Sequence, residues 1–135
     1  MRIPTNALIP VFAGAGLLHF VKPEPFDSIV PPQLPGRART YTLVSGAAEL
    51  AAATLLAAPA LGPRSNADHR RRSASLRRAG GAFSAALLAL VWPANFYMAW
   101  QWREKSWPKR AAAVARLPLQ LPMIRAAWRA TTERG

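Results

Sequence analysis

The chain has 135 residues, enough for one domain, and 18 basic against 6 acidic side chains give it a net charge of +12. Hydrophobic residues make up 51% of the chain, whereas charged residues make up 18% and fall in a few clusters. Lipid excludes charge and a soluble surface needs it throughout, so this clustering predicts a membrane protein and not a nucleic-acid binder. The absence of cysteine excludes disulfides, thiolate nucleophiles and cysteine metal sites.

Four segments have the composition of transmembrane helices, which need about 20 mostly apolar residues. They cover residues 3–21, 41–61, 79–101 and 111–128. We therefore expect an all-α fold, an integral-membrane four-helix bundle that forms a single domain over residues 1–135. The first segment lacks a convincing cleavage site, so an uncleaved helix is expected and not a signal peptide. Arg116, Gln120 and Arg125 interrupt the fourth segment, which either spans beside the others or lies at the interface.

The connection between the first two segments, residues 22–40, is rich in proline. Proline fixes φ and removes a backbone donor, so no regular helix is expected there. Phe26, Ile29 and Val30 are apolar, and they predict that this connection folds down as a cap at the outer membrane surface.

Basic residues set the expected orientation, because short cytoplasmic loops are enriched in Lys and Arg. The connection at residues 62–78 is predicted to be cytoplasmic, which places both termini in the cytoplasm of a multi-pass protein of the bacterial inner membrane. Its arginines are expected to contact anionic lipid headgroups at about 1 kcal/mol each: Arg70, Arg71, Arg72, Arg77 and Arg78. An aromatic belt is expected at the outer interface: Phe20, Tyr41, Phe96, Tyr97, Trp100, Trp102 and Trp107.

Polar side chains at membrane depth are costly and are candidates for function. The candidate site residues are His19, Glu49, Asn95, Arg116 and Gln120. In the predicted topology all of them fall in the outer half of the bilayer, with Glu49 roughly 12 Å from the outer end of its helix.

Two interpretations of this convergence stay open. In the structural one, Glu49 and Arg116 form a buried pair, while Asn95 and Gln120 satisfy carbonyls freed by nearby prolines. In the functional one, the same groups form the floor of a pocket under the cap, and His19 lies at its rim. This pocket holds a lipid headgroup or a quinone ring. A carboxylate and an imidazole could exchange protons with a quinol there.

The order of several stretches resembles that of the DoxX family of small bacterial membrane proteins. The matching stretches are AGAGLLHFVKPEPFDSIVPPQLP, TLVSGAAELAAATLL, VWPANFYMA and RLPLQLP. The positions that match the family pattern are His19, Pro23, Phe26, Pro31, Pro32, Pro35, Ser45, Gly46, Glu49, Pro93, Ala94, Asn95, Arg116, Pro118 and Gln120. The resemblance implies a four-helix membrane bundle and an association with redox, since DoxX-like proteins are similar to a subunit of a thiosulfate:quinone oxidoreductase. The chain departs from the family in PRSNADHRRRSASLRR, which is longer and richer in arginine than the usual connection.

Two functional hypotheses follow. The first is a DoxX-like inner-membrane subunit, non-catalytic or quinone-interacting, that supports membrane redox processes with protein partners. The second is a membrane scaffold, or a carrier of a small solute or lipid, without a redox role. No phosphate loop, serine-hydrolase elbow or dinucleotide fingerprint occurs, so no catalytic residue is identified and enzymatic activity is left open. No intrinsic cofactor or metal is expected, and a quinone is the candidate ligand.

Overall fold

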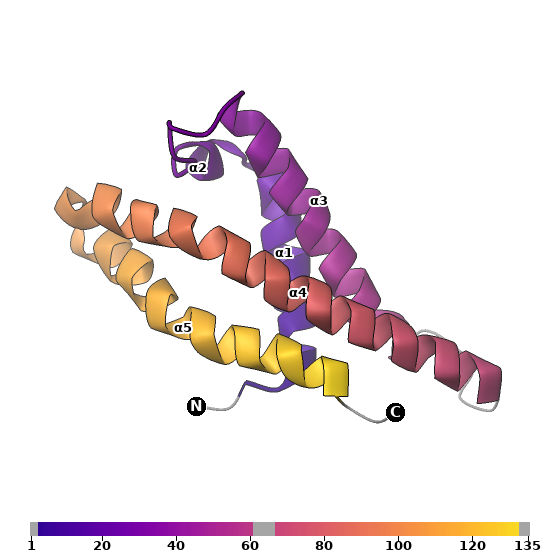
Figure 1. The fold of residues 1–135 in the computed structure, drawn as a ribbon. Coiled ribbons are helices and arrows are strands. Elements are labelled where there is room, and N and C mark those ends of the chain that lie inside the picture. Colours follow the sequence, from indigo (N-terminus) through magenta and orange to yellow (C-terminus); the bar gives the residue numbers. More distant parts are fainter. Residues whose placement is uncertain (1–2, 61–66, 133–135) are drawn as a thin grey trace.

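The computed structural model describes residues 3–60 and 67–132, and this part of the protein is all-α (Figure 1). Its long helices are α1 (Leu8–Val21), α3 (Ala38–Ala57), α4 (Ala67–Gln101) and α5 (Trp107–Thr132). The short elements are α2 (Glu24–Asp27) and the 3-10 turns η1 (Thr5–Ala7), η2 (Ala58–Ala60) and η3 (Trp102–Glu104). The predicted all-α class is confirmed.

Prolines set several of the helix ends. Helix α1 ends at Val21, just before Lys22 and Pro23, because the residue before a proline is disfavoured in helical conformation. The proline-rich connection then forms only the four-residue helix α2 and turns at Gly36, whose φ of +93° suits a residue without a Cβ. The predicted lack of a regular helix in this connection agrees with the structure.

The long helices form two antiparallel pairs, α1 with α3 and α4 with α5, and α3 also packs on α4 (Figure 1). We call the end that carries the first and last described residues the terminal end, and the end that carries α2 the cap end. The two pairs meet toward the terminal end and diverge toward the cap end (Figure 1).

Two adjacent glycines of α4 create the close contacts toward the terminal end. A Cβ added at Gly80 would lie 2.7 Å from the Leu55 Cβ of α3. A Cβ added at Gly81 would lie 2.7 Å from the Ala127 carbonyl oxygen and the Ala130 Cβ of α5. The missing side chains therefore let α4 approach both neighbours at backbone distance.

Hydrogen bonds tie the start of the chain to this packed region. The Thr5 hydroxyl donates to the Ala126 carbonyl at 3.0 Å, and Arg77 donates to the Asn6 side-chain oxygen at 2.9 Å. Arg77 also donates to the carbonyl of Leu56 at 3.1 Å, one of the last carbonyls of α3, which have no partner within the helix.

The pair α1–α3 has its own close contact at Gly16 and Gly46. A Cβ added at Gly46 would lie 2.6 Å from the His19 Cβ, and one added at Gly16 would lie 2.9 Å from the Gly46 carbonyl oxygen. This contact lies directly beside two of the candidate site residues, His19 and Glu49.

The arginine-rich connection differs from the expectation. Its residues from Ala67 to Arg78 are the first turns of α4 and not a loop, whereas residues 61–66 lie outside the described part. Ala, Arg and Leu are strong helix formers, and Ser73 packs its side chain inward on this extension. Helix α4 consequently begins well before residue 79, where the third segment was expected to begin.

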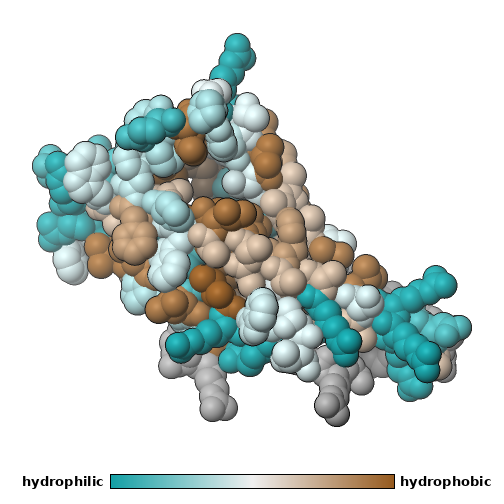
Figure 2. Space-filling view, viewed as in Figure 1, coloured by the Kyte–Doolittle hydropathy of each residue, from teal (hydrophilic) through white to brown (hydrophobic). Residues whose placement is uncertain are grey.

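Two helices are long and apolar enough to cross a membrane, Ala38–Ala60 and Ala67–Glu104. The helix Thr5–Val21 is apolar but shorter, and α5 does not reach the same hydropathy in its described residues. On the face in Figure 2, hydrophobic side chains gather over the middle of the helices and hydrophilic ones at their ends.

The glycine contact between α1 and α3 predicts a sharp contrast between two substitutions. Gly46→Ala places a Cβ where His19 stands and should destabilise the protein by about 1–3 kcal/mol, seen as a lower melting temperature in detergent. Gly14→Ala is the matched control, because a Cβ at Gly14 meets nothing within 4 Å and should be neutral or stabilising. Equal effects of the two substitutions would contradict the close α1–α3 contact.

Candidate ligand-binding cavity

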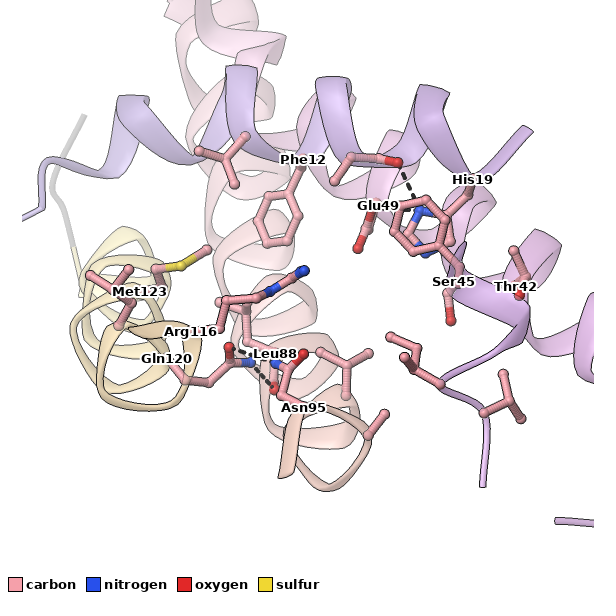
Figure 3. Close-up of a pocket in the computed structure, with 18 residues that line it drawn as sticks. Phe12, His19, Thr42, Ser45, Glu49, Leu88, Asn95, Arg116, Gln120 and Met123 are labelled. Carbon is pink, nitrogen blue, oxygen red and sulfur yellow. Dashed lines mark hydrogen bonds and ion pairs between the residues drawn. The ribbon is translucent and has the colours of Figure 1, made fainter. Parts of the chain in front are cut away.

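A cavity of about 240 Å³ lies between the two helix pairs, toward the cap end. It is visible as a hollow in Figure 2, and Figure 3 shows the side chains around it. Its lining residues are Val11, Phe12, Ala15, His19, Phe26, Ile29, Val30, Thr42, Ser45, Glu49, Leu88, Val91, Ala94, Asn95, Arg116, Leu119, Gln120 and Met123. Every long helix and the proline-rich connection contribute, and most of the lining is apolar.

His19 lies under the proline-rich connection between α1 and α3 and is only 7% exposed. Its Nδ1 stands 2.7 Å from the Ala15 carbonyl oxygen, which can only accept, so Nδ1 carries a hydrogen and Nε2 of the neutral ring keeps a lone pair. The ring stacks on Phe26 with a centroid separation of 3.8 Å. His19 is thus fixed in orientation and covered by the cap.

Glu49 reaches the cavity from α3, and the ionisable side chain closest to its carboxylate is that of His19. The Glu49 Oε2 atom lies 3.4 Å from His19 Nδ1, and this oxygen has no hydrogen-bond partner within the described residues. A carboxylate oxygen buried in this way can still accept a hydrogen bond from a donor that enters the cavity.

Arg116 reaches toward Glu49 from α5, on the opposite side of the cavity (Figure 3). Its side chain makes no ion pair or hydrogen bond within the part of the chain that the structure describes, so the Glu49–Arg116 pair of the structural interpretation is not formed. The Glu49 carboxylate, which accepts hydrogen bonds, and the Arg116 guanidinium, which donates them, therefore face each other across the cavity.

Asn95 and Gln120 form the structural part of the cavity wall. The Asn95 side chain donates to the Gln120 side-chain oxygen at 3.2 Å, and Gln120 donates to the Leu88 carbonyl at 2.5 Å. Pro93 has no N–H for the Ala89 carbonyl, so that carbonyl loses its helical donor. Gln120 binds the preceding carbonyl, that of Leu88, and not the carbonyl of Ala89. The two amides are only 6% and 4% exposed and bind α4 to α5.

The structure therefore brings all five candidate site residues to one cavity and divides their roles. Asn95 and Gln120 are bonded to each other, whereas Glu49 and Arg116 keep unused hydrogen-bonding capacity. Ser45 also lines the cavity and was missed as a site residue, although it lies one helical turn before Glu49 and so shares its face. Of the three apolar residues expected in the cap, Phe26, Ile29 and Val30, each lines the cavity.

Polar bonds hold the proline-rich connection over the cavity. Arg39 of α3 donates to the Asp27 carboxylate at 2.8 Å, and the Tyr41 hydroxyl donates to the Pro35 carbonyl at 2.6 Å. The Thr42 hydroxyl and the Arg39 guanidinium beside Asp27 hold the pKa of its carboxyl below its usual range. The connection is consequently fastened to α3 at neutral pH.

No group of three His, Cys, Asp or Glu side chains that could hold a metal ion occurs in residues 3–60 and 67–132. The chemistry of the cavity is that of a carboxylate, an imidazole, a hydroxyl and a guanidinium around an apolar space. These groups can donate hydrogen bonds to, and accept them from, the polar atoms of a small ring or a headgroup.

The fold and the cavity together define a small all-helical protein with a polar-sided cavity between two helix pairs. The chain belongs to the family described as Domain of unknown function (DUF8561), whose family model matches residues 8–68 and 72–131. The break between the two matched parts falls in the arginine-rich first turns of α4. No curated protein and no solved structure matches the chain significantly.

The hydrogen bonds of Gln120 predict that this side chain stabilises the α4–α5 pair. Gln120→Leu leaves the Asn95 amide without its acceptor and removes the side-chain donor to the Leu88 carbonyl. It should cost about 1–3 kcal/mol in a detergent melt. Gln101→Leu, at the end of α4, serves as the matched control and should change the melting temperature little. An unaffected melting temperature in Gln120→Leu would mean that these bonds are absent.

Proposed function

We propose that this protein is a multi-pass membrane protein with a four-helix bundle, and that its cavity binds the ring of a quinone or quinol. The proposal that the protein spans a membrane rests on how little of its two long apolar helices is buried. Only 22% and 28% of the apolar windows in Ala38–Ala60 and Ala67–Glu104 are buried within the protein, whereas the core helix of a soluble protein is mostly buried. Neither helix is at the N-terminus, where a signal sequence would be.

Side-chain burial supports the same proposal. Large apolar side chains stand on the outside of every long helix, among them Val21 at 79% exposed, Leu90 at 77% and Trp107 at 69%. Such a surface is costly in water and favourable in lipid. The first and fourth long helices, α1 and α5, join the bundle through their contacts with α3 and α4.

The proposed orientation is that of an inner-membrane protein with its terminal end in the cytoplasm. Exposed arginines, Arg70, Arg71, Arg72 and Arg78, lie on the first turns of α4, which start from the terminal-end side of the bundle. Exposed aromatic side chains, Phe20, Phe96, Trp100 and Trp107, lie on the segments that run to the cap end. Positive charge inside and an aromatic belt at the interface are the distribution that orients such helices.

The observation that carries the ligand proposal is the open space between Glu49 and Arg116. The cavity volume of about 240 Å³ exceeds the roughly 150 Å³ of a cavity that admits benzene, so a substituted six-membered ring fits. The walls contributed by Phe12, Val91 and Met123 are apolar, as ring faces require. A quinol hydroxyl can donate to Glu49 while its other oxygen accepts from Arg116.

The resemblance to the DoxX family supports a redox context for such a ligand, as a subunit in a membrane assembly with protein partners. Several of the residues that carry the resemblance also line the cavity, among them His19, Ser45, Glu49 and Arg116. The chain itself contains no cysteine, so thiol chemistry would have to come from a partner.

The orientation predicts which positions are accessible from each side of the membrane. Single cysteines at Ser75 and Ser106, both exposed, should label from opposite sides in this cysteine-free chain. Ser75 is preferred to Ser73, which is buried and bonded to His69. In intact cells an impermeant maleimide should label Ser106→Cys only, and labelling of Ser75→Cys would overturn the proposed orientation.

The ligand proposal predicts that quinone extracts with the purified protein. Glu49→Gln keeps the size of the side chain but weakens the acceptor, and should lower the co-extracted quinone about tenfold, equivalent to about 1.4 kcal/mol. Glu104→Gln removes an exposed acid of η3 outside the cavity and should change nothing. Chromatography of organic extracts measures both.

Two other results of the same extraction would decide against the proposal. Absence of quinone from the wild-type protein, with a different small molecule or lipid present, would favour the carrier function without a redox role. Equal quinone in wild type and Glu49→Gln would place the quinone outside this cavity.

A further inference from the structure

The cavity under the cap has an opening on its side, between α1 and α5. Of the residues that line it, only Val11 of α1 and Arg116 and Leu119 of α5 are exposed, and the others are half-buried or buried. Val11 is 48% exposed and Leu119 is 39% exposed. A residue that lines a cavity and also reaches the outer surface marks the mouth of that cavity. Helix α1 therefore forms one edge of the mouth, and α5 forms the other.

The packing of the helices explains why the cavity opens here. Helix α1 packs along α3 and helix α5 along α4, whereas α1 and α5 touch each other at few positions. Hydrogen bonds join Ile3 and Thr5, which precede α1, to Arg129 and Ala126 of α5, toward the terminal end. Within the described residues no hydrogen bond or ion pair joins α1 itself to α5. The space between these two helices is consequently not closed toward the cap end.

The other sides of the cavity are more closely covered. Under the cap, His19 and Thr42 are buried, and the cap itself is bonded to α3 through Arg39 and Tyr41. On the side that Figure 2 shows, the lining residues of α4 are buried or half-buried: Leu88, Val91, Ala94 and Asn95. The route with the most exposed lining therefore runs between α1 and α5.

This mouth lies near the middle of the proposed spans. Leu119 is about 18 Å from the start of α5 and about 20 Å from its end, at 1.5 Å per residue. Val11 is about 15 Å from the end of α1 under the cap, on the same count. The hydrocarbon core of a bilayer is about 30 Å thick, so a mouth at this depth opens to lipid and not to water.

The size of the cavity limits what it can hold. Its volume of about 240 Å³ admits a substituted ring and leaves little space for a long chain, since a cavity of roughly 150 Å³ already admits benzene. A long chain attached to such a ring must therefore leave the cavity. An isoprenoid chain has no polar atoms, so it can pass the apolar side chains of Val11 and Leu119 into lipid without leaving a polar group unsatisfied.

We propose that this mouth is a portal to the bilayer and that the ligand is a prenylated quinone. Its ring binds between Glu49 and Arg116, and its isoprenoid chain leaves the protein between Val11 and Leu119. The inference rests on the quinone proposal above and adds the class of quinone and its route, which is directly from the lipid. Lipid is as apolar as these side chains, so the portal admits the chain while the polar groups hold the ring.

The test uses the full chain in a neutral detergent and two probes with the same benzoquinone ring. One probe has no chain, and the other has a chain of two prenyl units. Affinities are measured from the rise in melting temperature with probe concentration. The wild type should bind both probes. Val11→Trp combined with Leu119→Trp narrows the mouth and should weaken binding of the chain-bearing probe about tenfold, equivalent to about 1.4 kcal/mol, without changing the binding of the chainless probe.

Val114→Trp is the matched control, because Val114 is 53% exposed on the same helix and lies outside the cavity lining. It should change neither affinity. A second readout needs no variant: a diazirine on the first prenyl unit should cross-link the wild type on α1 and α5, near Val11 and Leu119.

Cross-links confined to α3 and α4, near Ser45 and Ala94, would overturn the portal. Equal losses of both probes in the double variant would also overturn it, as would equal effects of the double variant and Val114→Trp. Binding of the chainless probe alone to the wild type would overturn the portal and leave the quinone proposal standing. Binding of neither probe to the wild type would overturn both proposals.

Discussion

The contact of α4 with two neighbours at Gly80 and Gly81 is the constraint on which the rest of the structure depends. Adjacent residues of a helix point about 100° apart, so two successive glycines open two different faces. Gly80 admits the backbone of α3 near Leu55, and Gly81 admits α5 near Ala130. Because this packing is concentrated toward the terminal end, the two helix pairs diverge toward the cap end and leave a space that side chains only partly fill (Figure 1).

The polar groups around that space differ in how many of their donors and acceptors remain free to bond a ligand. Asn95 and Gln120 are bonded to each other and to the backbone, and they fix the α4–α5 pair. Glu49 and Arg116 face each other without a direct bond, one as an acceptor and the other as a set of donors (Figure 3). In the proposed membrane location, separated charges such as these are costly unless another group compensates them. A ligand that bridges them is the simplest compensation, and the stacked His19–Phe26 pair closes the space from above.

The sequence predicts much of this arrangement because helical periodicity and membrane depth act locally. Counting residues along each span was enough to place His19, Glu49, Asn95, Arg116 and Gln120 at one level, and they line one cavity. Proline chemistry was enough to predict a connection without a regular helix, and the apolar residues Phe26 and Ile29 were enough to place it over the cavity.

The features that could not be predicted depend on contacts between helices. The Glu49 carboxylate lies beside His19 and forms no ion pair with Arg116. This placement follows from the closeness of α1 and α3 at Gly16 and Gly46, which no single helix reveals. The helical start of α4 was missed because clustered arginines were interpreted as a loop signal, although arginine is a good helix former. The opening beside Val11 and Leu119 lies between α1 and α5, and only the fold brings these two helices to one cavity.

The central claim is that the space between Glu49 and Arg116 is a binding site and not a packing gap. The most direct measurement is an experimental map of the wild-type protein purified from its native membrane into lipid nanodiscs, at a resolution that defines side chains. We expect ring-shaped density that belongs to no protein atom, within hydrogen-bond distance of both side chains and below Phe26. A collapsed cavity, in which the Glu49 carboxylate and the Arg116 guanidinium bond directly to each other with no density between them, would contradict it.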